Sequence, residues 1–175
     1  IVLTERMIKV ERIAVCPGSF DPVTYGHLDI IKRASLLFDK VIVLISANPS
    51  KTPSFSAAER MTMIEANIKG YDNVVIDILD GLLADYVKNV GAIAIVKGLR
   101  AVSDFEYEFQ MALANKKLYS GAETVFLTTS SENMYLSSSV VKQIAQFGGD
   151  ISHFVPECVL DFISQRLVVK EKSNE

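Results

Sequence analysis

The sequence predicts an α/β fold in which one parallel sheet of five strands carries helices on both faces. Five short apolar runs recur along the chain, and each is followed by a segment with helical periodicity. The second of these runs, KVIVLISA at residues 40–47, is almost entirely apolar and β-branched, which is typical of a strand buried on both faces. Strands that alternate with helices in this way form parallel sheets with right-handed crossovers.

The predicted elements follow one another in a regular order. Strands are expected at residues 12–16, 40–47, 73–79, 92–96 and 124–128. Helices are expected at residues 26–38, 56–69, 82–89, 103–119, 137–147 and 156–169. Capping boxes at Ser56–Glu59 and Ser103–Glu106 open two of these helices, and Gly91 ends another. We find no repeat or linker, so we predict one domain over residues 1–175, with an N-terminal extension at 1–11 and a frayed tail at 170–175.

Composition excludes several classes of protein. The 175 residues are 49% hydrophobic, which is enough for one core, and the net charge of −3 gives no general basic field for nucleic acid. No apolar stretch approaches the length of about 18 residues that a membrane span needs. Cys16 and Cys158 are far apart and form no CxxC pair, so we expect no metal site and two reduced thiols in the core of a cytoplasmic protein.

Cationic and hydroxyl side chains concentrate in the segments that follow the predicted strands. His27 follows the first strand, Lys51 the second, and Lys97 and Arg100 the fourth. A run of three serines, Ser137 to Ser139, follows the fifth strand, with Lys142 one helical turn further on. Ligands of open parallel sheets bind at the carboxyl ends of the strands. The pattern therefore predicts a local cationic cluster that binds a polyphosphate.

Each of these residues also has an ordinary structural interpretation. A histidine near a helix start is usually structural, a serine run usually caps a helix, and a lone lysine such as Lys51 is usually solvated. Asp21 is expected to brace its turn, and Phe105, Phe109 and Leu113 are expected in the core or an interface. The functional interpretation depends on all the segments together.

Four segments carry a resemblance to a known family. They are PGSFDPVTYGH at residues 17–27, NPSK at 48–51, KGLRAVSDFEYE at 97–108 and SSSVVK at 137–142. The first and last are similar to the HxGH and ISSSxxR signatures of the nucleotidyltransferase superfamily. Together with the two middle segments, they closely resemble the phosphopantetheine adenylyltransferase family over residues 12–159. The third segment is the one that separates this family from other nucleotidyltransferases.

The resemblance implies a Rossmann-like fold and a specific reaction. Members of this family transfer AMP from ATP to 4′-phosphopantetheine, which gives dephospho-coenzyme A and pyrophosphate. The resemblance implies direct in-line displacement, Mg²⁺ that accompanies ATP, a homohexamer, and coenzyme A as a feedback inhibitor. A cytoplasmic enzyme that binds neither nucleic acid nor membrane is expected.

The resemblance also assigns roles to individual residues. It implies catalytic roles for Ser19, His27, Lys51 and Arg100. It implies substrate binding by Ser19, Lys51, Lys97 and, through its backbone, Leu83. It implies ATP binding by Ser19, Phe20, His27, Gly98, Leu99, Arg100, Glu108, Asn133, Met134, Tyr135, Leu136, Ser137, Ser138 and Ser139. The chain departs from some members at Asn133, where they carry an aromatic residue.

Two other functions remain open from the residues. One is adenylyl or cytidylyl transfer to another acceptor, such as nicotinamide mononucleotide or a polyol phosphate. The other is a nucleotide sensor that binds ATP without turnover. A panel of acceptors distinguishes the first, and ATP binding without release of pyrophosphate distinguishes the second.

Overall fold

A computed structural model describes residues 10–46, 52–100 and 102–167 of the chain, the side chains of 102 and 103 excepted. Within these residues, five parallel strands form one sheet in the order β3-β2-β1-β4-β5. The strands are β1 (Ile13–Gly18), β2 (Lys40–Ile45), β3 (Val74–Ile78), β4 (Ala94–Leu99) and β5 (Glu123–Thr128). The prediction of a five-stranded parallel sheet in an α/β fold is confirmed.

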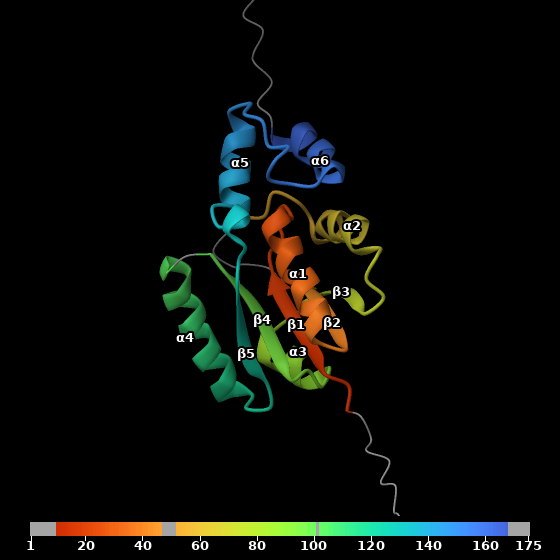
Figure 1. Ribbon diagram of the computed structural model, residues 1–175, viewed down its shortest axis with the longest axis vertical. Helices are drawn as coiled ribbons and strands as arrows, with labels where there is room; N and C mark the ends of the chain where they lie inside the picture. Colours follow the sequence, from red (N-terminus) through yellow and green to blue (C-terminus); the bar gives the residue numbers. More distant parts are fainter. Residues whose placement is uncertain (1–9, 47–51, 101, 168–175) are drawn as a thin grey trace, which may run out of the picture.

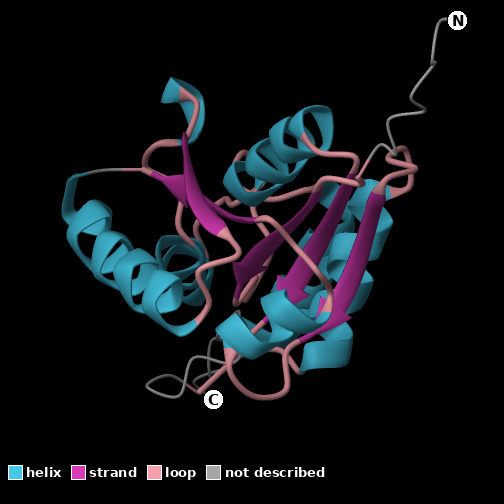
Figure 2. Ribbon diagram, turned by 90° about the horizontal axis from the view of Figure 1, so that it is seen from below, coloured by secondary structure: helices cyan, strands magenta, loops and turns pink. Residues whose placement is uncertain are grey.

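Helices connect the strands and also follow the last one. They are α1 (Tyr25–Leu37), α2 (Ala57–Ile68), α3 (Leu83–Asn89), α4 (Val102–Leu118), the short 3₁₀ helix η1 (Ser131–Asn133), α5 (Ser138–Gln146) and α6 (Glu157–Leu167). Figure 1 shows α5 and α6 beyond one end of the sheet and α4 beside β5. Seen from below in Figure 2, helices lie on both sides of the sheet. No helix in the described part of the chain is long and apolar enough to cross a membrane.

The sheet separates two apolar clusters because successive strand side chains point to opposite faces. In β1, Ala14 and Cys16 belong to the larger cluster, which α1, α2, α5 and α6 complete, whereas Val15 belongs to the smaller one. The smaller cluster is covered by α3, with Val87 fully buried in it. Burial on both faces explains why the strands read as continuous apolar runs.

The strand order reverses between β1 and β4, and this reversal locates the crevice in which such folds bind ligands. The chain runs outward from β1 to β3 and then returns, so that Ala14 pairs with Ala94 and Val15 with Ile95. Connections leave the two central strands in opposite directions at their carboxyl ends. A crevice at that edge is the expected binding place.

Two boundaries at this edge differ from the sequence prediction. β1 continues through Pro17 and Gly18, which pair with β2. β4 begins at Ala94 rather than at residue 92 and continues to Leu99, so that Lys97, predicted for a loop, is a strand residue opposite Phe126 of β5. The reason is that pairing with a neighbouring strand extends a strand beyond its apolar run.

The helix-capping signals that the sequence predicts within the described side chains are present in the structure. The capping box at Ser56 and Glu59 is present, and Gly91 follows α3 with a φ of 66°. The predicted box at Ser103 lies outside the described side chains.

Cys16 is buried as expected, but Cys158 is exposed, so the prediction that both thiols lie in the core is wrong for Cys158.

Candidate active site

A pocket of about 530 Å³ opens between the carboxyl ends of β1 and β4. Its floor includes Cys16 to Gly18 of β1 and Val96 to Gly98 of β4, and its walls come from the start of α1, α4 and the start of α5. The predicted site residues among its lining are Ser19, Phe20, His27, Lys97, Gly98, Arg100, Glu108, Leu136, Ser137, Ser138 and Ser139. Segments far apart in the sequence therefore meet in one pocket.

The turn after β1 places an aromatic ring against the pocket floor. Phe20 has a φ of 49°, a left-handed conformation that is uncommon outside glycine, and its side chain is buried. A Cβ atom at Gly18 would lie 2.8 Å from Cζ of Phe20, so any larger residue would have to displace this ring. The ring in turn meets the imidazole of His27 edge-on, with 5.1 Å between centroids. The turn thus packs directly against the histidine.

His27 is held by the N-terminus of its own helix. Thr24 is the N-cap of α1, and its backbone N–H donates to Nδ1 of His27 at 3.1 Å. The Thr24 hydroxyl accepts from the His27 backbone N–H at 3.4 Å, which completes a capping box with histidine in the place of glutamate. Because an amide N–H only donates, Nδ1 is the acceptor and the neutral ring carries its proton on Nε2. The ring therefore offers an Nε2–H donor.

Burial and charge keep this imidazole neutral. Burial, followed by the positive charge of Arg100, lowers the pKa of His27 to about 4. An ordinary histidine has a pKa near 6.5. At neutral pH, His27 therefore acts as a fixed hydrogen-bond donor and not as a cation.

The cations of the pocket are oriented by carboxylates of α4. Nζ of Lys97 lies 3.2 Å from Glu108, and Arg100 donates to both oxygens of Asp104 from Nε and Nη2, at 2.9 and 3.1 Å. Arg100 also donates from Nη1 to the carbonyl of Leu136 at 3.1 Å. The guanidinium is thus fixed on two sides, and its remaining N–H groups can serve a ligand.

The serine run has structural partners as well as a place in the pocket. Ser137 caps α5, because its hydroxyl accepts from the backbone N–H of Val140 at 3.1 Å. The hydroxyl of Ser138 donates to the carbonyl of Pro22 at 2.7 Å, which ties α5 to the turn after β1. The run therefore has the predicted capping role at Ser137, and all three serines also line the pocket.

Asp21 connects three segments around the pocket, as its predicted bracing role suggests. Its carboxylate, nearly buried, accepts the backbone N–H groups of Ser54 and Phe55 at 2.9–3.0 Å and the ammonium of Lys142 at 2.7 Å. Burial alone would raise the pKa of Asp21, but these hydrogen bonds outweigh it and lower the pKa. Lys142, predicted among the pocket cations, is thus paired with Asp21 and does not line the pocket.

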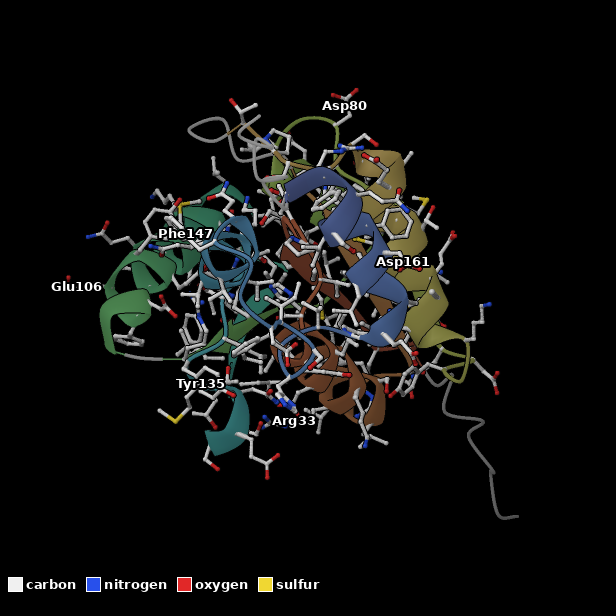
Figure 3. All side chains as sticks on the ribbon, turned by 90° about the horizontal axis from the view of Figure 1, so that it is seen from above. Arg33, Asp80, Glu106, Tyr135, Phe147 and Asp161 are labelled. Atoms are coloured by element: carbon white, nitrogen blue, oxygen red, sulfur yellow. The ribbon has the colours of Figure 1, made fainter. Side chains whose placement is uncertain are left out.

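Several predicted residues lie elsewhere. Leu83 packs beside the smaller apolar cluster, and Leu99 ends β4 without lining the pocket. Asn133 and Tyr135 line a second groove of about 430 Å³ beside α1, although Asn133 also approaches Gly26 of the first pocket, and Met134 is half exposed. Figure 3 shows Tyr135 near the rim of the molecule. Lys51 lies outside the described residues.

Sequence reasoning gave no role of their own to two residues that support the pocket, although Thr24 begins the segment that resembles the HxGH signature. Thr24 carries a signal, because a threonine three residues before His27 at a helix start matches a capping box with an unusual last member. Arg60 carries almost none, because an arginine in an amphipathic helix is expected on its polar face. It is instead only 5% exposed and donates from Nη1 to the carbonyl of Ser19 at 2.8 Å.

The described residues contain no group of three or more His, Cys, Asp or Glu side chains that could hold a metal ion. The carboxylates that line the pocket, Asp104 and Glu108, are each engaged by a cation. The pocket therefore presents the donor groups of cations, hydroxyls and amides, which are the groups that bind anions in proteins.

Comparison with known proteins agrees with this description. Residues 15–144 match the Cytidylyltransferase-like family. The phosphopantetheine adenylyltransferase of Caldanaerobacter subterraneus is 58% identical over 163 residues, which cover 93% of this chain and 99% of that protein. The protein of the same name from Alkaliphilus metalliredigens is 56% identical over 155 residues, covering 89% and 99%.

A solved structure of lower identity shares the fold. The nicotinic acid mononucleotide adenylyltransferase of Plasmodium falciparum aligns with a TM-score of 0.66 at 16% identity, over 89% of this chain and 96% of that one. The match to the Cytidylyltransferase-like family covers most of the chain. The two relatives at 58% and 56% identity narrow the assignment to one family of adenylyltransferases. The chain belongs to the phosphopantetheine adenylyltransferase family.

Proposed function

We propose that this enzyme transfers the adenylyl group of ATP to the phosphate of 4′-phosphopantetheine, giving dephospho-coenzyme A and pyrophosphate in coenzyme A biosynthesis. The observation that carries the proposal is the joint placement of Lys97, Arg100, His27 and the start of α5 around one pocket. Relatives at more than half identity over nearly their whole length are named for this reaction.

The reaction proceeds by direct in-line displacement. A phosphate oxygen of 4′-phosphopantetheine attacks the α-phosphorus of ATP, a new P–O bond forms, and the bond to the β-phosphate breaks as pyrophosphate leaves. The attacking phosphate is already an anion near neutral pH, because its second pKa is about 6. Catalysis then depends on positioning two mutually repelling anions and on stabilising the charge that shifts between them.

His27 and Arg100 serve the nucleotide in this scheme. The Nε2–H of a neutral His27 donates to an oxygen of the reacting phosphate, and its neutrality keeps it from titrating over the working pH range. Arg100, fixed by Asp104, supplies lasting positive charge to the departing phosphates. Ser19, Phe20, Gly98, Leu99, Glu108 and residues 133–139 complete the proposed ATP site.

The acceptor is held by a second group of residues. Lys97 and Ser19 contact its phosphate together with Lys51, and the Leu83 backbone contacts the pantetheine arm. Lys97 is a point charge already oriented by Glu108 at 3.2 Å, which suits a phosphate that must also move toward ATP.

Bound to ATP, Mg²⁺ would offset part of the charge of the nucleotide. Because the pocket carboxylates Asp104 and Glu108 are paired with Arg100 and Lys97, phosphate oxygens and water would supply most of its ligands. The protein's own residues then contribute orientation through the cations and amides described above.

Three further properties belong to the proposal. The enzyme works in the cytoplasm as a homo-oligomer, a hexamer, and coenzyme A inhibits it by overlapping the substrate site. Oligomerisation is supported by α4, where Phe105, Phe109 and Leu113 are 42%, 45% and 56% exposed in the single chain. Competition is tested by whether coenzyme A raises the KM for 4′-phosphopantetheine.

One assay tests the reaction itself. The protein is incubated with MgATP and 4′-phosphopantetheine, pyrophosphate is measured, and the product is identified by mass. Nicotinamide mononucleotide and glycerol 3-phosphate serve as alternative acceptors. We expect dephospho-coenzyme A only from 4′-phosphopantetheine, and a loss of at least about a hundredfold in His27→Ala. Turnover of another acceptor instead would overturn the substrate, and ATP binding without pyrophosphate release would favour a sensor.

A further inference from the structure

We propose that Arg60, in the first turn of α2, is a positioning residue that aims the backbone N–H of Phe20 into the pocket. The inference rests on the proposed function where its test measures kcat and KM with 4′-phosphopantetheine. The measurement of ATP affinity needs no acceptor and does not depend on the identity of the acceptor.

Arg60 lies in an unusual environment for an arginine. Its guanidinium is buried at the back of the turn that follows β1 and donates from Nη1 to the Ser19 carbonyl at 2.8 Å and from Nε to the Ser56 carbonyl at 3.3 Å. Among the residues that the structure describes, its partners are carbonyl oxygens and not carboxylates. Burying a cation without a counter-ion is costly, so its persistence here calls for a functional reason.

A single peptide group connects the contact of Arg60 with the N–H of Phe20. The Ser19 carbonyl and the Phe20 N–H belong to the same peptide, and the cis peptide among the described residues lies elsewhere, at Asp21–Pro22. In a planar trans peptide the C=O and N–H bonds point in opposite directions. Because Arg60 holds the carbonyl on one side, the Phe20 N–H is turned to the other side, away from α2.

The Phe20 N–H group belongs to a segment that lines the pocket. Ser19 and Phe20 both line the pocket, and no acceptor within the described residues binds the Phe20 N–H. The φ of 49° at Phe20 also departs from the conformations that non-glycine residues prefer, so the turn needs an external hold. Arg60 supplies that hold, and its charge polarises the peptide and strengthens the N–H as a donor to an anionic oxygen.

Two substitutions of Arg60 test this role in the full-length protein. ATP affinity is measured by calorimetry without acceptor, and kcat and KM are measured with 4′-phosphopantetheine. Arg60→Met should weaken ATP binding and lower kcat by about 10- to 100-fold, as loss of an outer-shell partner does. Arg60→Lys keeps the charge and one donor, so it should recover part of both quantities.

Arg166 offers a matched control on the neighbouring helix α6. It also donates to a backbone carbonyl, that of Ser54 at 2.9 Å, and it pairs with Glu59 at the start of α2 and lies 5.4 Å above the Phe55 ring. Arg166→Met should lower the melting temperature but leave ATP affinity and kcat per folded molecule unchanged.

The outcomes are distinct. ATP affinity and kcat in Arg60→Met that match those of Arg166→Met would reduce Arg60 to a structural residue and overturn the inference. If Arg60→Met does not fold, Arg60→Lys decides the case, since wild-type ATP affinity in that variant would equally overturn it. If the wild type binds ATP but forms no dephospho-coenzyme A, the proposed function fails while the ATP affinities still test Arg60.

Discussion

At His27 a helix cap and a chemical role coincide in one side chain. The N-cap amide of Thr24 fixes Nδ1, burial removes the charge, and the pocket receives the other side of the ring. A charged imidazole here would be repelled by Arg100 and would lose its solvation. The fold therefore stabilises the neutral donor that the proposed reaction uses.

This arrangement has a consequence for stability at low pH. The unfolded chain binds a proton on His27 below pH 6.5, whereas the folded chain does so only below about pH 4, so stability falls as the pH drops through this window and is flat below it. Relative to His27→Asn, the wild type should lose roughly 2–3 kcal/mol of unfolding free energy between pH 7 and pH 4.5. Urea denaturation of both proteins at the two pH values measures this loss, and equal losses in the two proteins would contradict a neutral His27.

Gly98 gives a second test of the pocket floor. A Cβ atom there would lie 2.8 Å from Cγ1 of Ile30, a buried side chain of α1 that also lines the pocket. Gly98→Ala should therefore cost about 1–3 kcal/mol of stability and raise the KM for ATP, because Ile30 must move. Thermal unfolding and steady-state kinetics measure these effects.

Gly70 provides the control for that substitution. Nothing lies within 4 Å of a Cβ atom placed at Gly70, which follows α2 far from the pocket lining. Gly70→Ala should be neutral or slightly stabilising. If Gly98→Ala and Gly70→Ala have the same stability and the same KM for ATP, the close approach of Ile30 to residue 98 does not affect stability or binding.

At the scale of elements, the pocket depends on how α5 is fastened to the turn after β1. Ser138 and Lys142 of α5 reach Pro22 and Asp21, and the same Asp21 holds the backbone just before α2. One carboxylate therefore ties the turn after β1 both to α5 and to the segment before α2. Its hydrogen bonds stabilise the fold above the ordinary pKa of an aspartate, near 4, and this contribution is lost as the pH falls below that value.

Asp21→Asn tests this connection. The amide oxygen still accepts from Ser54 and Phe55, but the ion pair with Lys142 is lost, so unfolding should become easier by about 1–3 kcal/mol and the KM for ATP should rise. Urea denaturation and ATP kinetics measure the two effects. The exposed pair of Lys116 and Glu123 is the control, and Glu123→Gln should change stability by less than about 1 kcal/mol. An ATP KM that falls in Asp21→Asn would mean that Asp21 competes for Lys142 instead of positioning α5.

Sequence reasoning found the elements because each signal is local. Apolar runs predicted the strands, and Ser56 with Glu59 predicted the start of α2, since hydrogen bonds within a few residues decide both. It placed Lys97 in a loop because strand pairing across the sheet is not visible in one segment. It missed Arg60 because burial of an arginine depends on a carbonyl 41 positions away.

For the whole molecule, the sequence placed many of the site residues at one edge but not their contacts. The rule that ligands bind at the carboxyl ends of parallel strands brought Ser19, His27, Lys97 and Arg100 together correctly. That rule does not specify how the segment between β5 and α5 passes α1. Asn133 and Tyr135 of this segment line a second groove. The position of Leu83 beyond the pocket has the same origin, because β3 is at the far edge of the sheet.

The exposed apolar side chains of α4 lead to a prediction about assembly. α4 contacts β4, β5 and α3, and Figure 1 shows it at the side of the molecule. Leu113 is 56% exposed there, and Phe105 stacks on Phe109 at 5.4 Å between centroids. Apolar surface gathered on one helix is stabilised when a second copy covers it. We expect light scattering after size-exclusion chromatography to give a homo-oligomer, with six chains as the proposed number.

Leu113→Glu tests whether α4 provides that contact. A buried, unpaired carboxylate in an interface is strongly unfavourable, so the variant should dissociate into smaller species while its circular dichroism stays that of a folded chain. Leu36→Glu is the control, because Leu36 of α1 is 78% exposed and lies away from α4. Dissociation by Leu36→Glu and not by Leu113→Glu would move the interface from α4 to α1, and a monomeric wild type would reject assembly altogether.

Because α4 also carries Asp104 and Glu108, a dissociated variant should lose activity along with its oligomeric state if the contact steadies the cations of the pocket.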